Sequence, residues 1–174
     1  MEISQIAPGL VPDAEWKKKK FKDKWYQGET ISYAIGQGYL LVTPLQILRL
    51  TAMIAKDGKV VNPRLIEQQE TGNSKEQLAV KPEHIKIIKQ AMLQVVESKF
   101  GTGQLARVNF DKMAAKTGTA QAPPHEPHGW ITGFFPYDKP EIAFVVFVEH
   151  GGPGGIVGAG LVKNIVQIWR EARV

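Results

Sequence analysis

The stretch that organises this chain is Ala114-Ala115-Lys116-Thr117-Gly118-Thr119-Ala120-Gln121. Short side chains on both sides of a single lysine predict a strand that another backbone can approach closely, and Gly118 leaves that approach clear. Lys116 supplies a positive charge, while Thr117 and Thr119 supply hydroxyls and backbone N–H groups. An extended ligand could pair with such an edge, its carboxylate near these groups. The tripeptide Lys116-Thr117-Gly118 is also compatible with an ordinary strand end that carries a solvated lysine. The surrounding sequence must therefore decide between a ligand-binding edge and such a strand end.

The composition is that of one globular domain. The chain has 174 residues, of which 43% are hydrophobic and 22% are charged, which is typical of a chain with a core rather than a disordered one. It contains no cysteine, so disulfides, thiolate metal sites and a cysteine nucleophile are excluded. The longest apolar run, Ile142–Val148, has the length of a strand and is too short for a membrane-spanning helix.

The formal net charge of +5 comes largely from a lysine run at Lys17–Lys20, continued by Lys22 and Lys24. Such a run is most often a solvated surface segment. We expect no nucleic-acid partner, because neither an interleaved aromatic platform nor a recognition helix accompanies the run. A surface that faces anionic lipid or an acidic polymer is the alternative that stays open.

The predicted elements divide the chain into four parts. These are a loop-rich lead-in at 1–42, irregular over 1–30, a helical part at 43–98, antiparallel strands at 112–149 and a closing helix at 159–173. Thr43-Pro44-Leu45-Gln46 predicts a helix start, since it combines a capping threonine with a proline suited to the first helical position, and Gly58 ends that helix. A second helix is expected from near Pro82 to near Ser98. Between them we expect an extended segment at 60–66 and a polar loop at 70–77.

Three consecutive segments predict antiparallel strands. After a Gly101-Thr102-Gly103 loop come the central Lys-Thr-Gly strand, a proline-stiffened loop at 122–128, a strand at 129–135 and a strand at 141–149. The third strand is apolar enough to be covered on both faces. The fold class is therefore α+β, with three antiparallel strands packed with helices.

The last part of the chain is expected to close the sheet. Gly151-Gly152-Pro153-Gly154-Gly155 predicts a flexible link, and a helix follows from about Ala159 to Ala172. The apolar stripe that we expect on the sheet is Leu161, Ile165, Ile168, Trp169 and Ala172.

At this point the sequence resembles a known family. Lys116-Thr117-Gly118-Thr119-Ala120-Gln121 is similar to the third active-site motif of penicillin-binding protein transpeptidases. The other similar segments, in order along the chain, are 8–12, 15–17, 36–38, 43–46, 129–136, 140–143 and 149–152. Their order and spacing cover nearly the whole chain and resemble class B enzymes of the elongation type, called penicillin-binding protein 2.

The resemblance implies the fold shared by penicillin-binding proteins and serine β-lactamases, and a D,D-transpeptidase that cross-links peptidoglycan stem peptides through an acyl-serine. It implies β-lactams as ligands and no cofactor. Lys116 and Thr119 would be catalytic, and Lys116, Thr117, Gly118 and Thr119 would bind substrate. Enzymes of this family are anchored in the bacterial inner membrane and work on its periplasmic side, so we expect this location for the parent protein.

Two motifs of the family do not occur in this sequence. None of the four serines, Ser4, Ser32, Ser74 and Ser98, has lysine three residues later or asparagine two residues later. We therefore expect the nucleophile upstream, and this chain to be the C-terminal part of the domain and inactive alone. With three of five family strands present, the central strand would have an unpaired edge, which predicts association with the upstream part of the same domain or self-association. The alternative is a non-catalytic sensor or scaffold that binds peptidoglycan or a partner.

The histidines suggest one further site. His125 and His128 are three residues apart, a spacing that zinc ligands can have. They lie in the proline-rich segment, where neighbouring histidines are more often solvated. We therefore predict no metal site.

Overall fold

The computed structural model describes residues 7–63 and 76–173, which fall into two compact units. The N-terminal unit comprises described residues 7–43, and the C-terminal unit comprises 44–63 and 76–173. Of the segments expected at 60–66 and 70–77, residues 64–66 and 70–75 lie outside the described residues. Within the described ranges, no helix is both long and apolar enough to cross a bilayer.

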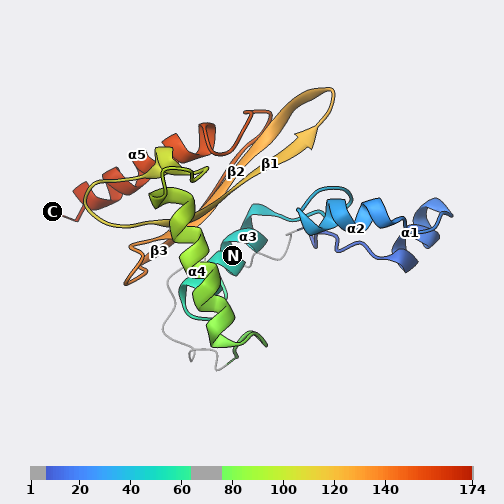
Figure 1. Ribbon diagram of the computed structural model, residues 1–174, viewed down its shortest axis with the longest axis horizontal. Coiled ribbons are helices and arrows are strands. Elements are labelled where there is room, and N and C mark those ends of the chain that lie inside the picture. Colours follow the sequence, from blue (N-terminus) through green and yellow to red (C-terminus); the bar gives the residue numbers. More distant parts are fainter. Residues whose placement is uncertain (1–6, 64–75, 174) are drawn as a thin grey trace. The chain divides into compact units, whose positions relative to one another are not determined.

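The N-terminal unit contains two short helices, α1 at Ala14–Phe21 and α2 at Gln27–Ala34 (Figure 1). The prediction of an irregular segment over 1–30 was therefore wrong for 14–21 and 27–30, which are helical. Asp13 caps α1 by accepting a hydrogen bond from the Trp16 N–H at 2.7 Å, and the Glu29 carboxylate accepts one from the Tyr26 N–H at 2.7 Å at the start of α2. These caps satisfy backbone donors that a helix start leaves unpaired, so even helices of eight residues can form.

The C-terminal unit is built on a three-stranded antiparallel sheet, which confirms the α+β class. The strands are β1 at Ala114–Ala122, β2 at His125–Phe135 and β3 at Ile142–Val148, in the order β1-β2-β3. Lys116 is paired with Thr132 and Gly118 with Trp130. Among the described residues, one edge of the Lys-Thr-Gly strand pairs with no other strand, as expected for a chain with three strands, and β2 is the middle strand of the three. Each tight connection places the next strand beside the last, so the middle segment in sequence is also the middle one in space.

The first two strands are longer than predicted. The segment at 122–128, expected as a loop, continues the pairing of β1 and β2, and the chain turns at Pro123–Pro124, whose peptide bond is cis. A register irregularity between Ala120 and Ala122 accompanies this extension. In Figure 1 the paired ends of β1 and β2 extend as a ribbon beyond the helices that cover the sheet.

Helices cover both faces of the sheet. They are α3 at Pro44–Ala55, α4 at Pro82–Glu97 and α5 at Val157–Glu171, with a short 3₁₀ turn, η1, at Gln104–Ala106. The predicted helix starts at residues 44 and 82 are confirmed. On one face Phe134 and Ala114 pack with Met92 of α4 and Ala55 of α3; on the other face lies the α5 core.

The apolar stripe of α5 differs from the predicted one. Ala159, Val162 and Val166 are buried against the sheet, with Trp169 packed beside them. Leu161, Ile165 and Ile168 are instead 47%, 48% and 65% exposed. Both rows recur every three or four residues, so helical periodicity alone could not choose between them.

The third strand is less buried than predicted. Helices α3 and α5 lie on its two faces. Nevertheless, each residue of β3 keeps at least partial exposure, and Phe147 is 38% exposed. Its outer edge pairs with no strand within the part of the chain that the structure describes.

Candidate functional site

Lys116 lies on the edge strand β1 with its side chain exposed. Side chains alternate between the faces of a strand, so Lys116 and Gly118 share the face of Ala114, which packs towards α3 and α4. Thr117 and Thr119 share the opposite face, that of Ala115 and α5. The Lys116 ammonium donates a hydrogen bond to the carbonyl oxygen of Thr117 at 2.5 Å. The charge is therefore folded back along its own strand edge.

The predicted site residues thus occupy one short segment of one edge, Lys116–Thr119, as the sequence indicated. The structure adds groups that sequence reasoning missed. Beneath Lys116, the cross-strand hydroxyl of Thr132 lies 2.7 Å from that of Thr51 in α3 and donates to the Phe144 carbonyl oxygen at 2.8 Å. Thr51 is 2% exposed, so the polar chain leads from the cross-strand partner of Lys116 into the buried interior.

Thr117 lies beside two other segments, Gly101–Gly103 and Gly151–Gly155, and is hydrogen-bonded to the first. Its Oγ lies 2.6 Å from the Oγ of Thr102, in the connection between α4 and β1. A Cβ added to Gly103 would lie 3.6 Å from the Thr117 methyl, and one added to Gly155 would lie 3.7 Å from it. Both are ordinary van der Waals distances, and the room that glycine leaves is elsewhere: a Cβ on Gly103 would lie 3.1 Å from a Val95 methyl, and one on Gly155 would overlap the Thr102 carbonyl oxygen. The sequence showed the Gly-Thr-Gly loop, but nothing in it placed the loop beside the strand.

The segment Gly151–Gly155 packs tightly on the sheet, so the prediction of a flexible link was wrong. A Cβ on Gly154 would lie only 2.5 Å from both the Gly118 carbonyl oxygen and the Trp130 nitrogen, and still closer to the Trp130 oxygen. Gly152 also donates its N–H to the Pro127 carbonyl at 2.9 Å. The glycines are required by this close approach of one backbone to another.

Gly118 has a second neighbour on the opposite face. A Cβ on Gly118 would lie 3.2 Å from the Cβ of Trp130, tighter than ordinary contact. The Trp130 ring packs against Phe147 of β3 with centroids 4.5 Å apart. The strand surface beside Lys116 therefore carries an aromatic pair, and Gly118 leaves room for the side chain of its cross-strand partner Trp130.

The histidines at the hairpin end pack on one another. The ring of His150 lies 4.5 Å from that of His128 and 4.8 Å from that of His125. The His128 Nδ1 accepts the backbone N–H of His150 at 3.0 Å. In the two described ranges no group of three His, Asp or Glu side chains is arranged to hold a metal. The absence of a metal site stays a prediction.

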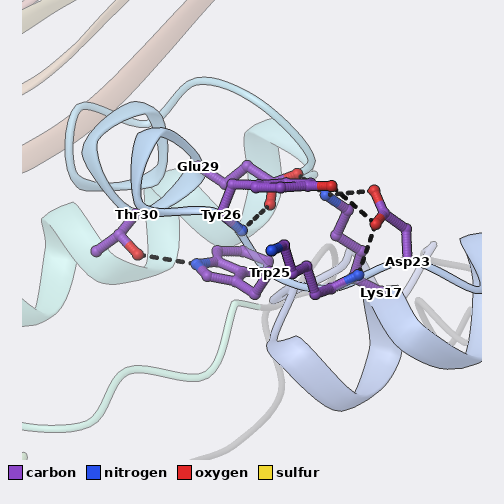
Figure 2. A network of polar contacts seen from close by, with 7 residues as sticks. Lys17, Asp23, Trp25, Tyr26, Glu29 and Thr30 are labelled. Atoms are coloured by element: carbon purple, nitrogen blue, oxygen red, sulfur yellow. Dashed lines mark hydrogen bonds and ion pairs between the residues drawn. The ribbon is translucent and has the colours of Figure 1, made fainter.

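The lysine run is only partly solvated. Lys18, Lys19 and Lys20 are exposed, but Lys17 is 4% exposed. Its ammonium lies 2.5 Å from the Glu29 carboxylate, 3.5 Å from Asp23 and 4.5 Å from the centre of the Tyr26 ring (Figure 2). The expectation of a solvated run was therefore wrong for Lys17, because a buried ammonium is tolerated where carboxylates compensate it.

This network shifts the pKa values of its members. Burial opposes the charged form of Lys17, but the carboxylates of Glu29 and Asp23 outweigh it and raise the Lys17 pKa. The hydrogen bond from Lys17, helped by the Tyr26 N–H, lowers the pKa of Glu29. The Lys24 N–H is the main cause of the lowered pKa of Asp23. The network ties α1 to the start of α2.

A separate open cavity of about 900 Å³ lies away from the strand edge. Glu97, Arg107, Asp111 and Lys163 line it, together with other polar residues. None of Lys116–Thr119 lines this cavity. The candidate site on β1 is therefore separate from this cavity.

Comparison with known proteins gives a consistent result. Residues 11–167 match the family model described as the penicillin binding protein transpeptidase domain. The chain is 34% identical to the peptidoglycan D,D-transpeptidase MrdA of Acinetobacter baumannii; the match covers 99% of this chain and 29% of that protein. It thus spans less than a third of the length of that relative.

Two solved structures have the same fold. The Pseudomonas aeruginosa PBP2 in complex with WCK 5153 superposes with a TM-score of 0.82 and 34% identity, over 92% of this chain and 36% of that one. The complex of penicillin-binding protein PBP2 with MreC from Helicobacter pylori superposes with a TM-score of 0.83 and 35% identity, over 95% and 32% respectively. The resemblance noted from the sequence is therefore confirmed.

Proposed function

Because the chain belongs to the penicillin-binding protein transpeptidase family, we propose that it supplies the Lys-Thr-Gly wall of a D,D-transpeptidase that cross-links peptidoglycan stem peptides. The observation that carries this proposal is the exposed edge at Lys116–Thr119, with Thr117 held by Thr102. An extended stem peptide can lie along such an edge as an added strand. β-Lactams are ligands of the same site in this proposal.

Each residue of the motif has a role in the proposed reaction. Lys116 polarises the site and donates a hydrogen bond to the serine of an upstream Ser-x-Asn motif. The hydroxyls of Thr117 and Thr119 bind the terminal carboxylate of the substrate, and the Thr119 N–H is one of the oxyanion donors. Gly118 keeps the edge clear. These roles follow the family pattern.

The covalent steps require a serine that this sequence does not contain in the family's pattern. In the proposed reaction, the oxygen of an upstream Ser-x-x-Lys serine attacks the carbonyl of the penultimate D-alanine, and its proton passes to the departing amine of the last D-alanine. An amine of a second stem then attacks the acyl-serine and restores the serine hydroxyl. This chain alone is proposed to be inactive, because it contributes the wall and an oxyanion donor but no nucleophile.

The surface of the C-terminal unit supports an upstream partner from the same domain. Leu161, Ile165 and Ile168 form an exposed apolar row along α5, and the outer edge of β3 pairs with no strand within the described ranges. Burying such a row and pairing such an edge would stabilise a complex. Self-association through the same surfaces is the competing outcome. We place the parent protein at the periplasmic side of the inner membrane, as the family suggests.

The test is the intact mass of the protein after incubation with benzylpenicillin. The chain alone should show no adduct. A chimaera in which this chain replaces the matching segment of the Acinetobacter baumannii relative should gain one equivalent of the drug on an upstream serine, and Lys116→Ala should abolish this. An adduct on the chain alone would overturn the proposed division of roles. An intact parent protein that never forms an adduct would favour the scaffold alternative.

A further inference from the structure

We propose that Thr102 is a positioning residue for Thr117: its hydroxyl donates a hydrogen bond to the Thr117 oxygen and leaves the Thr117 proton for the carboxylate of a ligand. This inference rests on the proposed function of the strand edge. It adds to the site a residue outside the Lys-Thr-Gly segment, and it states which of the two hydroxyls, Thr102, donates the hydrogen bond between them.

The contact between the two hydroxyls is short and well supported. The Oγ atoms lie 2.6 Å apart, at the short end of the range for an O–H···O bond. The Thr117 methyl faces Gly103 and Gly155, which carry no side chains, so the hydrogen bond to Thr102 is what holds the Thr117 rotamer. Thr117 is therefore held through its hydroxyl before any ligand arrives.

The loop that carries Thr102 is itself anchored. The Gly103 N–H donates to the Val95 carbonyl at 2.9 Å, at the end of α4. A Cβ on Gly101 would lie 2.6 Å from the Gln94 carbonyl oxygen, and one on Gly155 would overlap the carbonyl oxygen of Thr102. The backbone at Thr102 is thus held in place by these contacts, which fixes the position from which its side chain extends.

The direction of the proton follows from counting donors. A hydroxyl has one proton and two acceptor lone pairs, whereas an ionised carboxylate only accepts. If Thr117 donated to Thr102, it would have no proton left for a carboxylate. If Thr102 donates to Thr117, the Thr117 proton is free for the ligand, and the first hydrogen bond polarises the second. A carboxylate-binding Thr117 therefore requires Thr102 as the donor.

Two substitutions separate the hydroxyl from the shape of Thr102. Thr102→Val keeps the branched side chain and removes the proton donor. Thr102→Ser keeps the donor and removes the methyl. We expect Thr102→Val to slow acylation by benzylpenicillin about tenfold, as for the loss of one hydrogen bond near a charged group, and Thr102→Ser to stay within about twofold of the parent.

The first experiment measures acylation rates in the chimaera. Benzylpenicillin is compared with its methyl ester, which lacks the carboxylate charge. Thr102→Val should slow only the acid, and it should cost nothing further in a Thr117→Val background. A full additional loss in that background would show that Thr102 acts directly on the ligand. An equal loss for acid and ester would show a merely structural role. Either result would overturn the inference.

The second experiment needs no nucleophile and uses the 174-residue chain. Three-bond couplings in isotope-labelled protein report the χ1 angle of Thr117. We expect one rotamer in the parent and in Thr102→Ser, and averaging between rotamers in Thr102→Val. An unchanged single rotamer in Thr102→Val would refute the inference even if the strand edge binds stem peptides. A chimaera that never reacts with benzylpenicillin while this rotamer change occurs would instead count against the proposed function.

Discussion

The close packing of Gly154 on the sheet makes a prediction that joins stability to the site. In Gly154→Ala, the new methyl would lie 2.5 Å from the Gly118 oxygen, where ordinary contact begins at 3.4 Å. The loop or the strand must then move by about an ångström. The peptide group that ends in the Gly118 oxygen carries the Thr119 N–H at its other end, since the peptide unit is planar. A displaced Gly118 carbonyl therefore re-aims the proposed oxyanion donor.

The magnitude follows from the atoms that the methyl meets. All three are backbone atoms of the paired strands β1 and β2, which cannot turn away as a flexible side chain could. Overpacking of this kind costs about 1–3 kcal/mol. For a chain of this length, the corresponding fall in Tm is roughly 3–9 °C. Gly160, in the fourth position of α5, is the matched control, since a Cβ there meets nothing within 4 Å. Gly160→Ala should instead raise Tm by roughly 2–4 °C, because alanine favours a helix by about 1 kcal/mol over glycine.

Two assays check the two halves of this reasoning. Thermal unfolding followed by far-ultraviolet circular dichroism measures the stability of both variants. Acylation of the chimaera by benzylpenicillin measures the site, and Gly154→Ala should slow it at least about tenfold, since complete loss of an oxyanion donor costs about 100- to 1,000-fold. Equal Tm values for parent and Gly154→Ala would refute the packing argument. A destabilised variant with a normal acylation rate would refute the link through the shared peptide group.

Three further predictions concern stability and association. In the N-terminal unit, the lowered pKa of Glu29 stabilises the fold at pH values above the ordinary pKa near 4.5, and this stability is lost as the pH falls through the folded-state pKa. The raised pKa of Lys17 stabilises the fold at pH values below 10.5, and this stability is lost as the pH rises through the folded-state pKa. Trp fluorescence of the parent should therefore report loosening at both extremes, and Lys17→Met should be destabilised between them and lose the alkaline step. Phe134→Ala should lower the free energy of unfolding by about 3–5 kcal/mol, because Phe134 is fully buried; Phe100→Ala, at a residue 84% exposed, should change it by less than about 0.5 kcal/mol in urea titrations. Ile168→Glu should weaken self-association of the chain in sedimentation experiments, and unchanged association would exclude the α5 row as the contact.

The sequence was sufficient for the local signals and for the candidate edge. The helix start at Pro44 follows from proline at the first helical position, and the start near Pro82 follows from the helical spacing of the apolar residues after it; the structure places both helix starts at these prolines. The strand that contains Lys116–Thr119 follows from the short side chains around the lysine, and the pairing of β2 with β3 follows from the short turn between them. Helical periodicity could not decide which of two rows of apolar residues on α5 is buried, because both rows have the same period. The buried row of α5 is displaced from the predicted row because the choice depends on how the helix docks on the sheet.

The sequence failed in a different way at Gly151–Gly155. Considered alone, this segment resembles a flexible connection, because glycine permits motion and close packing equally. Gly101–Gly103 was expected as a loop and is one, but nothing in the sequence placed it beside Thr117. In the structure each segment has a glycine at a point where a Cβ would clash with a neighbouring backbone, and both segments lie beside Thr117. To distinguish a flexible link from a closely packed one, it is necessary to know which other segment of the chain lies against it. That segment is distant in the sequence, so local sequence patterns do not reveal it. A glycine substitution that destabilises the fold and disturbs Thr117 therefore identifies packing, whereas one that changes neither identifies a free connection.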